Sequence, residues 1–523
     1  MNTPLYASLA DSFRLNFYMP DSGLTTPPVV TAIAGENLPA LMQSDTPLQS
    51  VFLEADQDLG RLHQTMLAIR KKAIPIVHVS NESVVPALIQ YADENNLGDV
   101  TFCVPYEKRR LLPVLRQALP LSRGMLDIRK KGLPDDAADM AADCQLAEAT
   151  MVLVKGVLPR ETILRLQKRF VQVWTETEDL IPAILSGTCG ILTRNPEKLY
   201  EVLEQFPSGS VVRPTLLYAH KCLHGSGEFP ENTIPGAQAA GLRGYDACEI
   251  DICFTSDDVL VVHHDHDSKN LFTENCQIIK TPWNQLQKLR RKAFPDHGFD
   301  RFDELMVAMK EYPETPVLIE IKTPAATYGV EKAVRQMRSI LADERAQKNC
   351  TCIMGEMPPY LSYVHKHLPT LPLAHCTWIR EETPTSDLDE NNLRIYRFAE
   401  ATKGANAGYN PYHVQCRSDF ARAAHLRGIT VFVWTWAFKP WEEECKPITE
   451  CYMAGFDGIT SDWVHCYGDL PVDLEAADSM QVLRTGERVP CEVKTLAIGE
   501  TILHYCDCTL PTGDVYHFFA QKS

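Results

Sequence analysis

The sequence has no long hydrophobic run, no basic leader and no excess of positive charge. No stretch of the 523 residues is apolar for long enough to cross a bilayer, and Met1 to Pro20 lacks the basic start and apolar segment of a secretory signal. The formal net charge of -17 disfavours nucleic acid and anionic membrane surfaces as main partners. These absences predict a cytoplasmic protein without an integral membrane segment.

Cys-x-x-Cys pairs are also absent, although the chain has 17 cysteines. The pairs Cys350-x-Cys352 and Cys506-x-Cys508 are too tight for ordinary zinc spacing, and cysteines such as Cys248 fall inside apolar runs. This distribution is typical of small buried thiols in a reducing compartment. We therefore expect neither a zinc site nor a disulfide framework.

The first half of the chain alternates short apolar runs with segments of helical period. The runs are Val29–Ala34, Val51–Glu54, Ile74–Val79, Val100–Val104, Arg123–Ile128, Met151–Val154, Phe170–Trp174 and Gly190–Leu192. Eight such runs predict a parallel (β/α)8 barrel of the TIM type over residues 29–208, preceded by an N-terminal arm at 1–28.

A second alternation of the same kind begins at Leu216. Its runs are Leu216–Ala219, Ala247–Cys253, Val317–Ile321, Cys352–Met354, Leu373–Thr377, Ala407–Asn410, Val431–Trp436 and Gly458–Thr460. They predict a second barrel over residues 211–466, and the echo of Val171–Thr175 in Val431–Thr435 indicates a tandem duplication. Residues 467–523 have short β runs around turns, which predict a small β-rich module. The predicted class is α/β, with tandem barrels and a C-terminal β module.

Charged residues gather in apolar strands between Leu216 and Asp265. A short turn at Asp257-Asp258 predicts a β-hairpin that sets Asp251 opposite His264, with Glu249 on the same face as Asp251. Two carboxylates and an imidazole would then converge. Another carboxylate and an ammonium, Glu320 and Lys322, end a later apolar strand, where charge is costly without a partner.

These residues resemble the motifs of the glycerophosphodiester phosphodiesterase family. The chain carries, in the family's order, His220-Lys221-Cys222, Glu231-Asn232-Thr233, Glu249-Ile250-Asp251, His264-Asp265, Glu320-Ile321-Lys322, Trp434-Thr435 and Gly455-Phe456-Asp457-Gly458. The resemblance covers roughly Leu216 to Val464. One departure is that Lys221-Cys222 stands where the family has Arg-Gly, which keeps the charge but loses the bidentate fork toward phosphate.

The resemblance implies a metal-dependent enzyme in the second barrel. Glu249, Asp251 and Glu320 would hold a divalent cation, Mg²⁺ or Ca²⁺, because three hard oxygen ligands suit those ions. The acid and base would be His220 and His264. The implied phosphate-binding residues are Lys221 and Lys322, and the implied supporting or substrate-contacting residues are Glu231 and Trp434. Each of these side chains also has a structural interpretation, such as an ion pair, a helix-starting charge or a barrel-filling aromatic.

The implied reaction is hydrolysis of a glycerophosphodiester, a small-molecule substrate, to an alcohol and glycerol phosphate. The attacking oxygen could be water or a substrate hydroxyl, and the sequence leaves the alcohol and the oligomeric state open. The alternative is a non-catalytic phosphodiester-binding or scaffold protein on the same barrel. We expect the first barrel to be inert, because Glu54 and Asp56 imitate the paired carboxylates but no histidine ends its first strand.

Overall fold

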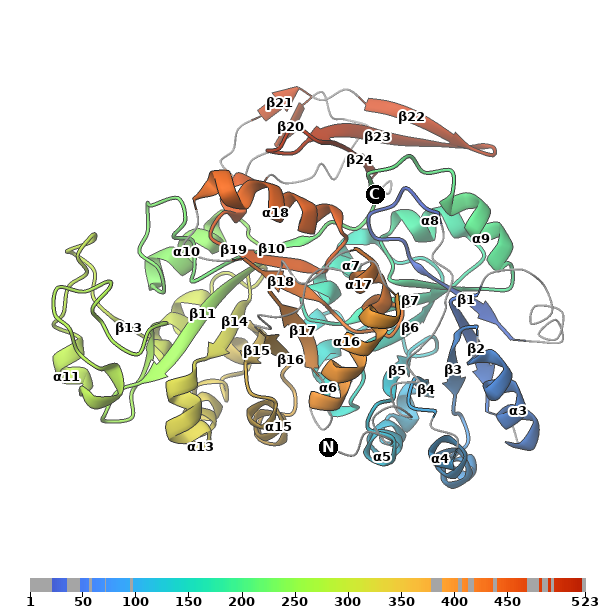
Figure 1. Ribbon diagram of the computed structural model, residues 1–523, viewed down its shortest axis with the longest axis horizontal. Helices are drawn as coiled ribbons and strands as arrows, with labels where there is room; N and C mark the ends of the chain where they lie inside the picture. The colour runs from blue at the N-terminus through green and yellow to red at the C-terminus, as the bar shows by residue number, and fades with distance from the viewer. Residues whose placement is uncertain are drawn as a thin grey trace.

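The computed structural model contains two barrels side by side with a β-sheet over both (Figure 1). It describes residues 21–34, 48–55, 59–70, 72–94, 97–377, 388–402, 407–412, 418–435, 440–467, 479–481, 488–490 and 493–519. Asp56 and most of the predicted N-terminal arm lie outside these ranges. Within them, no helix has the length and apolar character that crossing a membrane requires.

The first barrel closes from eight parallel strands in sequence order, as predicted. They are β1 (Val29–Ile33), β2 (Ser50–Glu54), β3 (Ile74–His78), β4 (Thr101–Pro105), β5 (Arg123–Asp127), β6 (Met151–Lys155), β7 (Gln172–Glu176) and β8 (Gly190–Thr193). The surrounding helices are α3 (Leu59–Ile69), α4 (Val85–Glu94), α5 (Leu111–Ala118), α6 (Ala137–Leu146), α7 (Arg160–Gln167), α8 (Leu180–Leu185) and α9 (Pro196–Leu203). Pairing of Val29 with Gly190 joins β8 to β1 and closes the ring.

The second barrel repeats this plan with one looser seam. Its strands are β10 (Leu216–Ala219), β11 (Ala247–Phe254), β14 (Val317–Ile321), β15 (Cys350–Gly355), β16 (Leu373–Thr377), β17 (Ala407–Pro411), β18 (Phe432–Trp434) and β19 (Gly458–Ser461). Between β17 and β18, the described residues form only two isolated bridges, Tyr409 with Val431 and Tyr412 with Trp434. The tandem-barrel fold is thus confirmed, with the second ring nearly closed.

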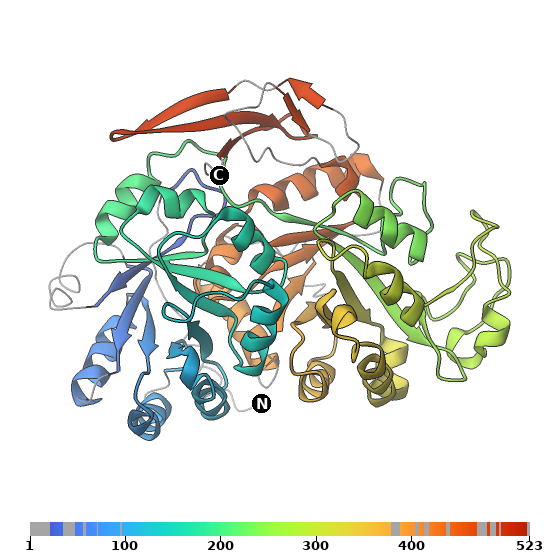
Figure 2. The same ribbon diagram turned by 180° about the vertical axis from the view of Figure 1, so that it is seen from behind.

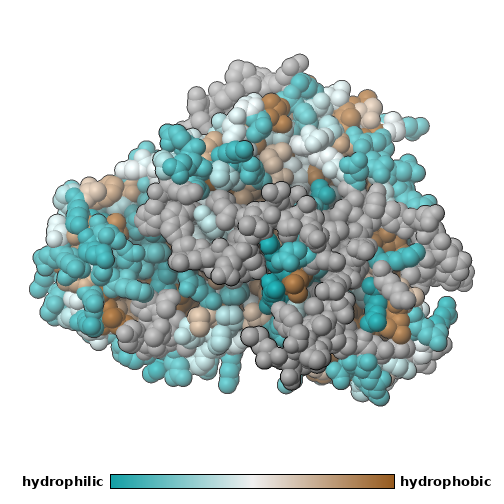
Figure 3. All heavy atoms as spheres, viewed as in Figure 1, coloured by the Kyte–Doolittle hydropathy of each residue, from teal (hydrophilic) through white to brown (hydrophobic). Residues whose placement is uncertain are grey.

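Helices cover the outside of the second barrel. They are α10 (Ile234–Leu242), α12 (Phe302–Met309), α13 (Thr323–Ile340), α14 (Glu344–Lys348), α15 (Pro358–His367), α16 (Leu388–Ala401), α17 (Ser418–His425) and α18 (Trp441–Met453). An excursion after β11 carries β12 (Leu260–Val262), α11 (Trp283–Leu286) and β13 (Asp300–Arg301), and its face in Figure 3 is mostly hydrophilic.

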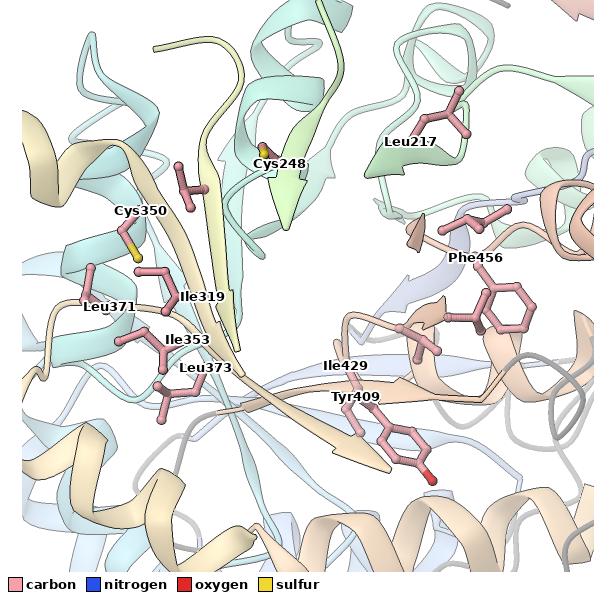
Figure 4. Close-up of a cluster of buried hydrophobic side chains, with 14 of the residues drawn as sticks. Leu217, Cys248, Ile319, Cys350, Ile353, Leu371, Leu373, Tyr409, Ile429 and Phe456 are labelled. Carbon is pink, nitrogen blue, oxygen red and sulfur yellow. The ribbon is translucent and has the colours of Figure 1, made fainter. Parts of the chain in front are cut away.

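The strands of the second barrel have two apolar layers because successive side chains point to opposite faces. Residues such as Leu217, Cys248 and Ile319 belong to a core cluster shared with the helices (Figure 4). Their neighbours Tyr218 and Leu318 belong to a separate cluster inside the barrel. The inner face of each strand can therefore carry polar or charged residues without disturbing the packing of the helices on the outer face.

Phe170 of the first barrel closes the floor of the second. It belongs to the inner cluster of the second barrel, 5.0 Å edge-to-face from the ring of Phe432, and it is buried. Its backbone takes a left-handed φ of 62°, which is uncommon for an aromatic residue. The predicted strand Phe170–Trp174 was wrong at its start, because Phe170 turns away into the neighbouring barrel and β7 begins at Gln172.

The two barrels meet through the N-terminal ends of their strands. Arg427, just before β18, forms a buried ion pair with Asp99, just before β4, at 2.8 Å, and Asp99 also pairs with Arg123 at the start of β5. Gln172, the first residue of β7, donates to the carbonyl of Ile429 before β18. Because both sets of strands begin at this interface, the two C-terminal mouths face away from each other.

The C-terminal β module bridges the barrels. Strands β22 (Val493–Ile498), β23 (Thr501–Thr509) and β24 (Val515–Phe519) form one sheet with β9 (Ser210–Val211), which lies in the linker between the barrels. A small pair, β20 (Ser479–Gln481) with β21 (Arg488–Pro490), completes the module. Both views show the sheet lying over the two barrels (Figures 1 and 2). The predicted β-rich module exists, and its sheet incorporates the linker.

Candidate active site

The inner faces of the second barrel change from apolar to charged toward the C-terminal mouth. On β11, buried Ala247 is followed at two-residue intervals by Glu249 and Asp251. On β14, Leu318 is followed in the same way by Glu320, and Lys322 comes directly after the strand. A period of two keeps these side chains on one face. The strand ends therefore collect charge where barrels of this type hold their active sites.

Glu249, Asp251 and Glu320 form a compact carboxylate cluster. Each offers an oxygen within 4.8 Å of the others, and all three residues are buried. Glu249 Oε2 accepts a hydrogen bond from the backbone N–H of Lys221 at 2.7 Å. Its Oε1 is buried, with no hydrogen-bond partner among the residues that the structure describes. Burial and the neighbouring charges of Asp251 and Glu320 raise the pKa of Glu249 well above its usual range.

Asp251 is held by an amide and an ammonium. Its Oδ2 accepts from Asn232 Nδ2 at 2.9 Å, and its Oδ1 lies 3.2 Å from Lys322 Nζ. Lys322 also donates to Glu320 Oε1 at 2.6 Å. Burial opposes ionisation of Asp251, but the positive charge of Lys322, together with nearby cationic groups and the Asn232 hydrogen bond, holds the pKa of this carboxyl below its usual range. Lys322, which the family resemblance places near phosphate, thus also neutralises two of the three carboxylates.

Asn232 is a site residue whose individual role the sequence did not reveal. In the Glu231-Asn232-Thr233 motif, Thr233 caps α10 by accepting from the Gly236 N–H. Asn232 takes a left-handed φ of 53°, and its Oδ1 accepts from the Asp251 N–H at 3.0 Å while its Nδ2 holds the carboxylate. The motif therefore fixes the position of Asp251 as well as starting a helix.

His220 lies in a hydrogen-bonded group at the end of β10. Its Nδ1 is 2.6 Å from Asp462 Oδ1, and His224 Nε2 is 2.9 Å from the same oxygen. Burial lowers the pKa of His220, although Asp462 opposes that change. Bonding at Nδ1 leaves Nε2 as the ring nitrogen for proton transfer.

Neither Asp462 nor His224 had a predicted role. Asp462 directly follows β19, and the only sequence signal for it was its place after the eighth predicted run. The loop that carries His224 passes very close to Asp462, because a Cβ on Gly225 would lie 1.8 Å from the Asp462 carbonyl oxygen. Glycine therefore permits the approach that places His224 on this carboxylate.

His264 lies on the other side of the cluster, in a hairpin with a different register from the predicted one. Ile252 pairs with Val262, and the His263 N–H donates to the Asp251 carbonyl, so Asp251 is opposite His263 rather than His264. The loop between Thr255 and Val259 has three residues and uses a left-handed Asp258, which moves the register by one position.

His264 still reaches the pocket because it lies just beyond the strand. Its Nδ1 is 2.8 Å from Asp265 Oδ1, which again leaves Nε2 for chemistry. His263, the residue before His264, is buried and packs against Phe272 and Phe299. Burial lowers the pKa of His263 to about 4.

The remaining predicted residues also lie at this mouth. Lys221 is 3% exposed, and its Nζ lies 3.5 Å from Glu231 Oε1, so Glu231 is its ion-pair partner. Burial opposes the Lys221 ammonium, but the combined negative charge of Glu231, Asp251 and Asp462 raises its pKa. Trp434 donates through Nε1 to the Thr377 carbonyl and packs 4.7 Å from the Tyr412 ring.

A single cavity of about 320 Å³ connects these groups. Both histidines, both lysines, Glu249 and Glu320 line it on one side. Its other wall comes from the ends of β15 to β18 and includes Met354, Glu356, Cys376 and Trp434. A cavity of this size fits a small organic ligand. Most of the charged groups lie on the first side, and the second wall combines Glu356 with the apolar side chains of Met354 and Trp434.

The donor set fits a hard divalent cation. Three carboxylates supply oxygen ligands, and the unpartnered Glu249 Oε1 is a buried lone-pair donor of the kind that a cation satisfies. Without a cation, the three buried carboxylates are balanced mainly by the charge of Lys322, with His264 and Lys221 as further cationic neighbours of Asp251. The residues present are therefore those expected of a Mg²⁺ or Ca²⁺ site rather than of zinc.

Known proteins are similar to this half of the chain. Residues 225–465 match the model of the Glycerophosphoryl diester phosphodiesterase family. A candidate glycerophosphodiester phosphodiesterase of Bacillus subtilis, YhdW, is 24% identical over 46% of this chain and 91% of its own length.

Two solved structures are also similar. A phosphodiesterase from Oleispira antarctica in complex with the product sn-glycerol-3-phosphate is 17% identical, with a TM-score of 0.38, over 48% of this chain and 94% of that one. A glycerophosphodiester phosphodiesterase from Parabacteroides distasonis is 18% identical, with a TM-score of 0.37, over the same shares.

The family match confirms the resemblance and the enzyme class, a phosphodiesterase, that the ordered motifs predicted. The match begins after His220, so the structure supplies the relation of that histidine to the rest of the site. The second barrel of this chain belongs to the glycerophosphoryl diester phosphodiesterase family.

Proposed function

We propose that the second barrel hydrolyses glycerophosphodiesters, or related small phosphodiesters, to an alcohol and glycerol phosphate with the help of a divalent cation. The observation that carries this proposal is the carboxylate cluster with two carboxylate-bound histidines on one 320 Å³ cavity. The product in the complex of the Oleispira antarctica phosphodiesterase, sn-glycerol-3-phosphate, is consistent with it.

Glu249, Asp251 and Glu320 would hold the cation, Mg²⁺ or Ca²⁺. When bound, such an ion supplies Lewis-acid polarisation of a phosphoryl oxygen. Asn232 and the Lys221 N–H fix the carboxylates before any ligand arrives, since both bonds come from buried groups. This preorganisation lets the site bind without rearranging its strands.

His220 and His264 act as base and acid in this proposal. His220 accepts the proton of the attacking water at Nε2, because Asp462 holds the Nδ1 proton and stabilises the imidazolium that forms. The P–O bond to the alcohol breaks as the new P–O bond forms. His264, held through Nδ1 by Asp265, gives its Nε2 proton to the departing alkoxide.

The two lysines neutralise the negative charge that develops on the phosphoryl oxygens. Lys322 already balances Asp251 and Glu320, and Lys221 is paired with Glu231. Both ammonium groups line the cavity. A lysine at position 221 acts as a point charge and lacks the two aligned donors of an arginine.

A product-release assay tests the proposal. The full-length chain should release alcohol and glycerol phosphate from glycerophosphocholine or glycerophosphoethanolamine with added Mg²⁺ or Ca²⁺, and excess chelator should stop turnover. Binding of these diesters without release would instead support a non-catalytic scaffold. Undiminished turnover in excess chelator would remove the cation from the mechanism.

A further inference from the structure

A second cavity, of about 440 Å³, lies between the barrels, away from the mouth of the second one. Six basic residues line it: Arg165, Lys168, Arg169, Lys310, Arg345 and Lys348. Only three acidic residues, Asp135, Asp136 and Glu314, line it with them. The whole chain has the opposite balance, with 51 basic and 68 acidic residues. The cavity therefore concentrates positive charge in an acidic protein.

Arg169 is a buried guanidinium in this cavity. It follows α7 of the first barrel, is 8% exposed, and donates through Nη1 to the Cys350 carbonyl of the second barrel at 3.3 Å. Within the described part of the chain, no carboxylate lies within ion-pair distance of it. A buried charge without an ionic partner is costly, and burial lowers the pKa of Arg169 accordingly.

Arg345 on α14 of the second barrel contributes another guanidinium. It is exposed and, across the described ranges, also has no ion-pair partner. The other four cations have carboxylate partners: Arg165 pairs with Glu314, Lys168 with Asp246, Lys310 with Asp343, and Lys348 with Asp136, Asp139 and Glu344. Each barrel thus contributes one arginine to the cavity, and neither arginine has a carboxylate partner within the described ranges.

We propose that this cavity binds a small phosphate monoester, with Arg169 and Arg345 as its two charged contacts. Guanidinium groups match a phosphate dianion because their planar N–H donors align with two of its oxygens. The volume leaves room for a short organic group beside the phosphate, and Ala137, Pro313 and Pro316 provide apolar surface for it.

Such a ligand would touch both barrels at once. Its binding would favour their docked arrangement, since any ligand that binds only the native state stabilises it by mass action. The site is separate from the hydrolytic cavity, because the two cavities share no lining residue. The proposal therefore stands or falls independently of the hydrolytic function.

Calorimetric titration of the full-length chain tests this site. The probes are inorganic phosphate and glycerol 3-phosphate, with succinate as a carboxylate of similar charge, in excess chelator so that the proposed cation at the other mouth is removed. The variants are Arg345→Glu, which alters an exposed side chain, and Arg169→Met, which keeps the buried volume. Arg335→Glu is the matched control, since Arg335 is an exposed arginine on α13 outside the cavity.

We expect the wild type and Arg335→Glu to bind one equivalent of phosphate monoester, and both cavity variants to bind at least about tenfold more weakly. The thermal midpoint should rise with ligand only in the first two proteins. Hydrolysis of a diester by Arg345→Glu should be unchanged. Equal affinity in Arg345→Glu and Arg335→Glu, no binding by the wild type at millimolar concentration, or equally tight binding of succinate would each overturn the proposal.

Discussion

The mouths of the two barrels both carry three carboxylates, but they balance the charge differently. In the first barrel, His78 lies between Glu54 and Asp127, with Nδ1 2.7 Å from one and Nε2 3.1 Å from the other. Arg129 pairs with Asp127 and with Glu176. In the second barrel, Lys322 alone contacts two carboxylates, and Glu249 Oε1 has no partner in the described structure.

This comparison separates a satisfied ionic network from a site prepared for a ligand. The cations of the first mouth already form ion pairs with each of its three carboxylates. Among the described residues, the second mouth keeps a buried acceptor without a partner and two histidines whose Nε2 atoms make no hydrogen bond. Similar residue types at the ends of barrel strands therefore do not imply similar chemistry.

The sharpest test of this comparison removes equivalent carboxylates from each barrel in turn. Glu54 ends the second strand of the first barrel, and Glu249 lies on the second strand of the second. Glu249→Ala should lower turnover on the order of a thousandfold or more, because the proposed cation loses a ligand. Glu54→Ala combined with Asp56→Ala should leave turnover intact. Steady-state hydrolysis rates measure both, and the reverse result would place the active site in the first barrel.

The histidines provide the next comparison. His220→Ala and His264→Ala should each lower kcat by roughly two to four orders of magnitude, the range for a positioned acid or base. His78→Ala, at the first mouth, should leave kcat unchanged. Circular dichroism would show whether each variant is folded. A near wild-type rate in a folded His220→Ala or His264→Ala protein would make that histidine a structural residue.

Stability should depend strongly on the aromatic contact between the barrels. Phe170→Ala should lower the free energy of unfolding by about 3 to 5 kcal/mol, because it leaves a cavity against Phe432 and Tyr218. Urea denaturation measures this change, with half-buried Phe294→Ala as the control. If both variants lose the same amount, Phe170 has no special part in joining the barrels.

The first mouth should make stability depend on pH. Burial opposes the His78 imidazolium, but Asp127 and Glu54 raise its pKa from 6.5 to about 9. Since the folded pKa exceeds the unfolded one, this stabilisation is fully present below pH 6.5 and is lost as pH rises through 9. It is at most about 3 kcal/mol, and less because Glu54 is 59% exposed.

Urea denaturation of the wild type and His78→Gln at pH 6 and pH 10 tests this dependence. The stability advantage of the wild type should be large at pH 6 and nearly absent at pH 10. An advantage that is equal at both values would show that the imidazolium does not stabilise the first mouth.

The smallest expected effect concerns the departure from the family motif. Lys221→Arg should keep activity or raise it a few-fold if residue 221 contacts phosphate, since arginine adds a second aligned donor. Lys221→Ala should raise KM and lower kcat. Equal kinetics in all three proteins would mean that the ion pair with Glu231 is the whole role of Lys221.

Cys222 marks the same departure in the backbone. Its φ of 69° lies in the left-handed region, where the glycine of the family motif is unstrained. Lys221 before it has a φ of 46°, so the turn after β10 takes its shape with two non-glycine residues. The departure therefore places a non-glycine residue in a conformation that favours glycine.

The sequence by itself determined the strands and much of the site. Alternating apolar runs located both sets of eight strands, because the period of two depends only on neighbouring residues. The same period put Glu249 and Asp251 on one face. The ordered motifs identified the family and some of the residues that line the cavity, among them His220, Glu249 and Lys322.

Only the tertiary structure decided the contacts between distant segments. Asp462 meets His220 across 242 residues, and Phe170 fills the floor of a barrel to which it does not belong. Chain periodicity carries no information about which strand ends close a ring or which barrel faces meet. Closure of the ring and docking of the N-terminal faces fix those pairs, since they depend on the packing of the whole molecule.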